Sequence, residues 1–206
     1  NHLYIHAVEA SPNPAKARAA ADRLRNLVPG SGHLLHMPAH IYARLGEWDL
    51  AADSNLRSIR TDNVFTRANP RPDFYAMYMA HSRHFLAFSR MMQGRSADAL
   101  AAAREMVAAI PDQFLEEYGP IADGFLVFVP EVLVRFGRWE EVLKEPAPRQ
   151  LLPFSTAMWH FTRAVSLNAL GRDKEAHAER GNFMRAAKKI PPDSTFGNNL
   201  SSDLIA

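Results

Sequence analysis

Histidine is concentrated near the start of this chain, where seven of its nine histidines lie. These are His2, His6, His33, His36, His40, His81 and His84. Several of them stand three or four positions apart, a spacing that places side chains on one face of a helix. Neutral imidazole is the commonest metal ligand in proteins, and its pKa lies near neutral pH. The pattern therefore predicts a metal or acid–base site assembled from several helices.

The spacing also predicts which donors act together. His2, His6 and Glu9 stand at i, i+4 and i+7, so one helix offers two ring nitrogens and a carboxylate. His36 with His40 and His81 with His84 form two further pairs. Nitrogen and oxygen donors fit zinc, copper(II), nickel, iron or manganese. We predict a transition-metal site with these candidate ligands: His2, His6, Glu9, His36, His40, His81 and His84.

Other uses of these histidines stay open. They could hydrogen-bond a small ligand in a groove, or fill space. Pro38 favours the first turn of a helix. A helix that begins near Met37 would leave His33 and His36 on a turn or cap. We interpret His160 as structural and His177 as solvated.

The elements that must position these residues are predicted to be helices. Alanine-rich amphipathic stretches alternate with glycine and proline, and no segment shows sustained alternation of polar and apolar residues between turn signals. The expected fold class is all-α.

A motif of helix, glycine, short turn and helix recurs at Gly46, Gly94, Gly137 and Gly171. The small or apolar residues after the turn are equally spaced at both ends of the series, from Ala17 to Ala51 and from Val142 to Ala176, and are farther apart between Ala51, Ala99 and Val142. This pattern resembles the tetratricopeptide repeat (TPR), a helix–turn–helix unit whose length matches that interval. The resemblance implies a right-handed solenoid in which the first helix of each unit lines a concave groove.

Alignment on these residues gives one TPR-like solenoid over 1–206, with about five units. The units are 1–31, 32–65, 75–112, 120–150 and 155–190, and 191–206 is the predicted start of a further helix. Surplus residues are expected in loops around Asp62–Asp73 and Asp112–Pro120. The chain begins at Asn1, and we interpret it as a fragment of a longer array.

The resemblance implies that positions 2, 5, 9 and 12 of each first helix face the groove. These positions hold the seven histidines named above and Glu9. The predicted ligand groove also contains His33, Tyr4, Tyr78, Phe88 and Glu131, and Tyr75 and Arg83 are expected near it. Tyr42 is expected in the core. Glu131 is a candidate general base or further ligand.

Two segments add a narrower resemblance. NHLYIHAVEA (Asn1–Ala10) and GHLLHMPAHIY (Gly32–Tyr42) resemble segments of bacterial TPR proteins of unassigned activity. Three functions follow as hypotheses: a scaffold that binds a transition metal or small ligand, a protein- or peptide-binding scaffold without metal, and a metal-dependent enzyme. In the enzyme, Glu9 or Glu131 would be the base beside a metal-bound water. Bacterial cytoplasm and periplasm both remain open.

Composition excludes several other classes. Basic and acidic residues nearly balance at 24 and 22, without a basic block, so nucleic acid is not an expected partner. No apolar run reaches the roughly 18 residues of a membrane span. Cysteine is absent, which excludes disulfides, cysteine-ligated zinc and iron–sulfur clusters.

Overall fold

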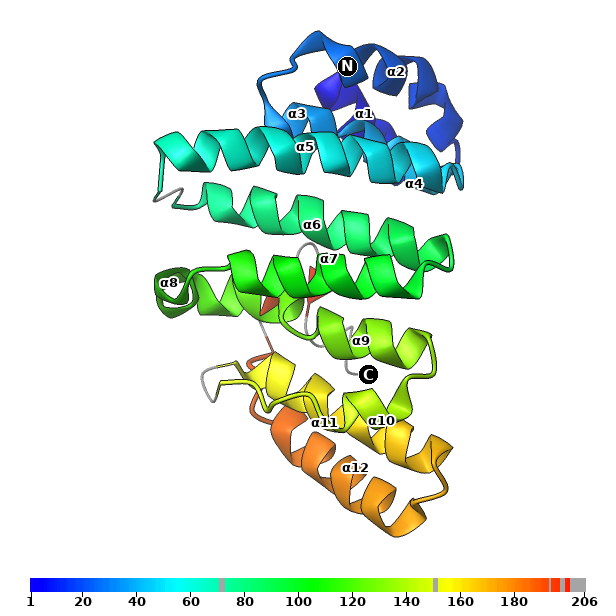
Figure 1. Cartoon of the computed structure of the whole chain (residues 1–206), viewed down its shortest axis with the longest axis vertical. Helices are drawn as coiled ribbons and strands as arrows, with labels where there is room; N and C mark the ends of the chain where they lie inside the picture. Colours follow the sequence, from blue (N-terminus) through cyan, green and yellow to red (C-terminus); the bar gives the residue numbers. More distant parts are fainter. Residues whose placement is uncertain (71–72, 150–151, 193, 197–198, 201–206) are drawn as a thin grey trace. The chain divides into compact units, whose positions relative to one another are not determined.

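A computed structural model describes residues 1–70, 73–149, 152–192, 194–196 and 199–200. These residues are mainly helical (Figure 1), which confirms the predicted all-α class. The backbone contacts divide the chain into two compact units, Asn1–Ala109 and Ile110–Ala206. Among the described residues, no helix combines the length and apolar character that crossing a membrane requires.

The first unit contains seven α-helices in its described part and a short 3-10 helix, Pro14–Ala17. The α-helices are α1 (His2–Glu9), α2 (Arg18–Leu27), α3 (Gly32–His36), α4 (Pro38–Arg44), α5 (Trp48–Ala68), α6 (Tyr75–Met92) and α7 (Ser96–Ala109). Helices α5, α6 and α7 lie side by side, each in contact with the next (Figure 1). Helices α3 and α4 pack on α5, and α3 also contacts α6.

Small side chains allow the first helices of this unit to approach closely. Ala17, Ala21 and Ala51 are fully buried against Ile5 and Tyr42. The Tyr42 hydroxyl donates a hydrogen bond of 2.8 Å to an Asp22 carboxylate oxygen, so its buried ring keeps a polar partner. Tyr42 is thus a core residue, as predicted, and Ile5 anchors α1 to the core.

The four glycines of the recurring motif form the same turn. Their φ angles are +74° at Gly46, +72° at Gly94, +67° at Gly137 and +71° at Gly171, in the region that favours glycine. In each turn the next residue donates its backbone N–H to the carbonyl five positions before it: Glu47 to Tyr42, Arg95 to Arg90, Arg138 to Leu133 and Arg172 to Leu167. This is the hydrogen bond of a Schellman helix end. One repeated sequence motif therefore corresponds to one repeated helix–turn–helix geometry.

The second unit contains α8 (Asp112–Ala122), α9 (Phe128–Arg135), α10 (Trp139–Val142), α11 (Pro153–Ala169) and α12 (Asp173–Ala187). A 3-10 helix, Asp123–Phe125, precedes α9. The Asp123 carboxylate accepts backbone hydrogen bonds from Phe154 at 2.8 Å and Ser155 at 2.9 Å. It therefore caps the start of α11 from a neighbouring element.

The structure shortens the first predicted insertion loop and replaces most of the second with a helix. Helix α5 continues through Ala68, because Asp62 is buried in it and accepts a hydrogen bond from the Tyr75 hydroxyl at 2.9 Å. Asp112–Pro120 lies in α8 rather than in a loop. Its helical geometry is interrupted at Tyr118 (φ −121°, ψ 22°), two positions before Pro120.

The end of the chain also differs from the prediction. Within 191–206, β1 (Thr195–Phe196) pairs antiparallel with β2 (Asn199–Leu200), so these four residues do not start a helix. Residues 193, 197–198 and 201–206 lie outside the described residues.

Candidate metal centre

Four helices of the first unit bring six histidines together in two groups of three. The outer trio is His2, His6 and His33, and the inner trio is His36, His40 and His81. Within each trio, one ring nitrogen from every histidine lies within 4.8 Å of the other two. Helix α1 supplies His2 and His6, α3 supplies His33 and His36, α4 supplies His40 and α6 supplies His81.

Pro38 divides the histidine segment without separating its side chains. Helix α4 begins at Pro38, close to the predicted start, but the residues before it form the helix α3 rather than a turn. Met37 between them keeps helical angles (φ −51°, ψ −37°). Consequently His36 Nε2 lies 2.8 Å from His40 Nε2. The alternative that left His33 and His36 on a turn or cap is therefore wrong.

A tight contact fixes the start of α3. A Cβ atom on Gly32 would lie 1.9 Å from Asp62 Oδ1, far inside van der Waals contact. The Asp62 carboxylate is itself held by the Tyr75 hydroxyl. Because only glycine fits here, α3 can sit directly on α5 with its two histidines turned toward α1 and α6.

In the inner trio, Asn55 decides which nitrogen of His36 carries the proton. Asn55 Nδ2 donates to the Ala51 carbonyl at 2.8 Å, so its Oδ1 faces His36 Nδ1 at 2.6 Å. A carbonyl oxygen only accepts, and therefore His36 Nδ1 must donate. In the neutral ring, the Nε2 lone pair then points at His40.

Glu9 acts in the same way on one histidine from each trio. Its Oε2 lies 2.5 Å from His40 Nδ1, and its Oε1 lies 3.1 Å from His6 Nδ1. Both Nδ1 atoms face an acceptor and donate to it, so in the neutral form of each ring the Nε2 atom carries a lone pair. Burial acts to raise the pKa of Glu9, but the hydrogen bonds from His40 and His6 hold it below the usual value. Glu9 is thus an ionised carboxylate behind the two trios.

The outer trio has a similar inward geometry. His2 Nε2 lies 3.1 Å from His6 Nε2 and 3.1 Å from His33 Nε2. Two nitrogens bound at ~2.1 Å to one ion in tetrahedral or octahedral geometry stand ~3.0–3.4 Å apart. The Nε2 separations of 3.1 Å here, and 2.8 Å in the inner trio, are close to that spacing.

Burial keeps most of these rings neutral. It is the main cause that lowers the pKa of His81 to about 3 and the pKa of His33 to about 4, with neighbouring histidines adding to the shift. The fully buried His36 has a pKa well below the usual value for the same reasons. A metal ligand needs an unprotonated nitrogen, so these rings are in the required form at neutral pH.

His84 is outside both trios. Its ring centroid lies 6.4 Å from that of His81, and burial lowers its pKa to about 4. The sequence pattern selected eight residues, the seven histidines and Glu9. Six of these histidines form the two trios, and Glu9 accepts hydrogen bonds from the Nδ1 atoms of His6 and His40.

The predicted groove residues are dispersed. Tyr78 lies edge-on to His33, with ring centroids 4.7 Å apart, and stays partly exposed. Tyr4 is exposed, and Phe88 packs against Trp48. Glu131 belongs to α9 of the second unit, where burial raises its pKa to about 7.

A buried polar layer between α5 and α6 was not predicted. Tyr75 and Arg83 belong to it rather than to a groove, because Arg83 donates to the Met79 carbonyl and to Asn63 Oδ1. Ser54, Ser58 and Asp62 occupy it from α5. Their spacing of four positions was the available signal, since three small polar residues at i, i+4 and i+8 mark one face of a helix. Asn55, the partner of His36, stands next to that face.

Comparison of the chain with protein-family models, characterised proteins and solved structures finds no match. The interpretation of the site therefore rests on its own geometry.

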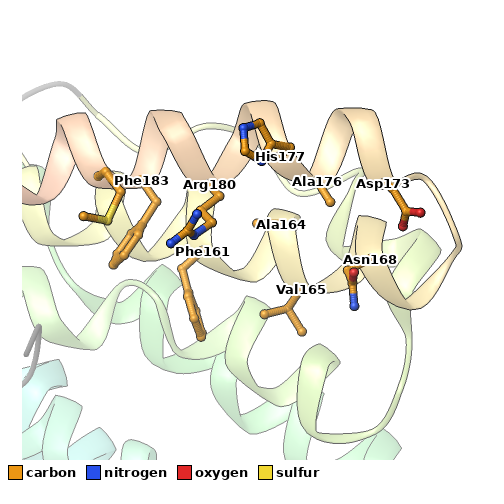
Figure 2. A pocket seen from close by; sticks show the side chains of 10 residues that line it. Phe161, Ala164, Val165, Asn168, Asp173, Ala176, His177, Arg180 and Phe183 are labelled. Carbon is orange, nitrogen blue, oxygen red and sulfur yellow. The ribbon is translucent and has the colours of Figure 1, made fainter.

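The remaining two histidines lie in the second unit. His160 Nδ1 lies 2.6 Å from a Glu179 oxygen, and Arg163 binds the other oxygen at 2.8 Å, as expected for a structural residue. His177 is exposed and lines an open, mainly apolar cleft of about 590 Å³ between α11 and α12 (Figure 2). Phe161 and Met184 are the most exposed of its large apolar side chains.

Proposed function

We propose that this protein binds a divalent transition-metal ion through the inner trio. The observation that carries the proposal is the facing pair of nitrogens, His36 Nε2 and His40 Nε2, at 2.8 Å. Asn55 and Glu9 accept hydrogen bonds from the Nδ1 atoms of His36 and His40, so these rings in their neutral forms would present lone pairs to each other. Such an arrangement is repulsive unless a proton or a cation lies between the nitrogens.

A metal ion satisfies more of this arrangement than a proton does, because a proton on His40 beside Glu9 joins two ring nitrogens, whereas an ion can be shared by all three histidines. An imidazolium at His36 would place charge on a side chain that is only 1% exposed. One ring nitrogen of His81 lies within 4.8 Å of those of His36 and His40, which gives three candidate ligand atoms. Three histidines with one further open position are a common zinc arrangement, and they also suit copper(II), nickel, iron or manganese.

The surroundings support the same proposal. Ligating histidines usually donate their second ring N–H to a carboxylate or carbonyl, which fixes the ring and raises its basicity. Asn55 does this for His36, and Glu9 does it for His40. In this arrangement Glu9 positions ligands. It is a poor candidate for the base of a metal-dependent enzyme, because both of its oxygens already accept hydrogen bonds.

The scaffold that carries the site is proposed to be TPR-like. The four equivalent glycine turns and the equal intervals from Ala17 to Ala51 and from Val142 to Ala176 support this assignment. A solenoid of this kind suits the site because stacked repeats form an extended surface to which several helices contribute side chains, including metal-binding histidines.

The test uses the untagged full chain. Elemental analysis should find bound metal, and Co²⁺ should give visible ligand-field bands when added to the metal-free protein. His81→Ala should change or remove those bands and weaken binding at least tenfold, with the helical circular dichroism retained. His177→Ala, on the exposed face of α12, is the matched control. Failure of Zn²⁺, Cu²⁺, Ni²⁺, Co²⁺, Fe²⁺ and Mn²⁺ to bind or to raise the melting temperature would refute the proposal.

A further inference from the structure

In the outer trio, a single proton cannot satisfy all three ring nitrogens that face one another. Glu9 accepts from His6 Nδ1, so in the neutral form of this ring His6 Nε2 would present a lone pair to His2 Nε2. His33 Nε2 approaches the same His2 nitrogen from the other side, also at 3.1 Å. A proton on His2 Nε2 can form a good hydrogen bond to one of these neighbours, not to both. A cation at the centre of the trio would satisfy all three nitrogens at once.

The two trios are immediate neighbours. Ring centroids lie 6.1 Å apart for His6 and His40, and 6.3 Å apart for His33 and His36. Each of these pairs joins a histidine of the outer trio to one of the inner trio. Two cations at such a short range repel each other, and a shared anion nearby reduces that repulsion.

Glu9 is the anion in the required place. One of its oxygens accepts from His6 and the other from His40, so a single carboxylate orients one ligand of each trio. Its negative charge acts on both positions. Glu9 contacts the Nδ1 atoms of these two rings, whereas their Nε2 atoms face other histidines. It therefore serves as a positioning residue for both trios.

We infer that the outer trio is a second transition-metal site, so that the histidine cluster is a two-metal centre whose sites share Glu9. This inference rests on the proposed function of the inner trio. The inner site binds more tightly, because His36 is buried and held by Asn55, whereas His6 is exposed and His2 half-buried. The outer ion exchanges faster with solvent and is the one that added chelators and anions reach first.

Stoichiometry tests the inference on the full chain. Zinc titration of metal-free protein, followed by calorimetry and elemental analysis, should give two ions per chain. His2→Ala should leave the tighter ion only, His81→Ala should leave the weaker ion only, and His177→Ala should retain both. One ion in the parent protein, unaffected by His2→Ala, overturns the second site while the proposed function stands. No ion at all refutes the proposed function itself.

Copper(II) gives a readout that does not depend on affinity. With two equivalents bound, the electron paramagnetic resonance spectrum should show dipolar broadening between neighbouring ions. His2→Ala, loaded with one equivalent, should give a sharp spectrum of one isolated ion. A sharp spectrum from the parent protein at two equivalents would place the ions far apart and overturn the two-metal centre.

Glu9→Leu tests the shared role of the carboxylate. Leucine is of similar size but offers no acceptor to either histidine and carries no charge. Both sites should still fill, each about 10–100-fold more weakly, which is the usual effect of losing such a partner. Glu179→Gln, which alters the carboxylate beside His160, is the control and should leave both affinities unchanged. Weakening of one site alone would overturn the sharing.

Discussion

Asn55 and His36 form a buried hydrogen bond of 2.6 Å in which the imidazole Nδ1 donates to the amide oxygen. The direction follows from the second bond of Asn55, whose Nδ2 donates to the Ala51 carbonyl. Asn55 therefore fixes the proton of His36 on Nδ1. Its two hydrogen bonds can be tested separately, because one orients the imidazole and the other ties Asn55 to its own helix, α5.

Substitution of Asn55 should separate ligand orientation from stability. Asn55→Asp keeps an acceptor for His36 but loses the donor to Ala51, so metal affinity should persist while the protein loses about 1–3 kcal/mol of stability. Asn55→Leu removes the acceptor and should weaken zinc binding about 10–100-fold. Zinc titration and urea unfolding of both variants measure the two effects. Equal affinities for the two variants would contradict the role assigned to the amide oxygen.

The stability of the metal-free protein should fall on acidification. The pKa values of about 3 for His81 and about 4 for His84 lie below the usual 6.5 of a histidine in an unfolded chain. Between these values the unfolded state binds more protons, so this contribution to stability is complete above pH 6.5 and is lost as pH falls to about 4 for His84 and about 3 for His81. Each buried histidine contributes at most about 1.4 kcal/mol per pH unit.

Urea unfolding at pH 7.5 and pH 5.5 measures this dependence on metal-free protein. His84→Leu removes one titrating group outside both trios, so its stability should vary less with pH than that of the parent. A variant with an unchanged pH dependence would show that the burial of His84 does not depress its pKa.

Gly32→Ala should disrupt the placement of α3. The added methyl would collide with Asp62 Oδ1, and overpacking of this kind costs about 1–3 kcal/mol. Displacement of α3 should also weaken zinc binding, because His33 and His36 move with it. Gly30→Ala is the matched control, since its methyl would meet no atom within 4 Å. Thermal unfolding and zinc titration that do not distinguish the two variants would contradict this account.

Asp123→Ala should act on the second unit alone. It removes the acceptor for the N–H groups of Phe154 and Ser155 and should cost about 1–2 kcal/mol, as loss of a helix cap does. Zinc affinity should stay within twofold of the parent, because all six trio histidines belong to the first unit. A matching loss of affinity, measured by the same titration, would show that the two units are energetically coupled.

The sequence predicted the helical class and the gathering of histidines because both depend on local spacing. Spacings of three and four positions predicted which rings share a helix face, and the glycine motif predicted the turns. It did not separate the histidines into two trios, since that depends on how α1, α3 and α6 pack. The partner of His36 had no local signal, because Asn55 reaches it from a different helix, α5, whereas Glu9 follows His6 by three positions on one helix.

The predicted loops extended into helical residues for a related reason. Aspartate, asparagine and proline between Asp62 and Asp73 are typical of a loop. Within the fold, however, Asp62 finds Tyr75 as a buried partner, and this long-range bond favours the extension of α5. Local polarity alone does not show whether a side chain will find such a partner.

The separation of the ligands along the chain has a further consequence. A metal ion at the inner trio would join His36 to His81, and one at the outer trio would join His2 to His33, tying together helices that no side-chain covalent bond connects. In a chain without cysteine, the ions would act as reversible cross-links that close long loops and restrict the unfolded chain, as disulfides do elsewhere. Chelation would then be equivalent to reduction: it would remove both cross-links and return conformational freedom to the unfolded chain, which lowers the free energy of unfolding.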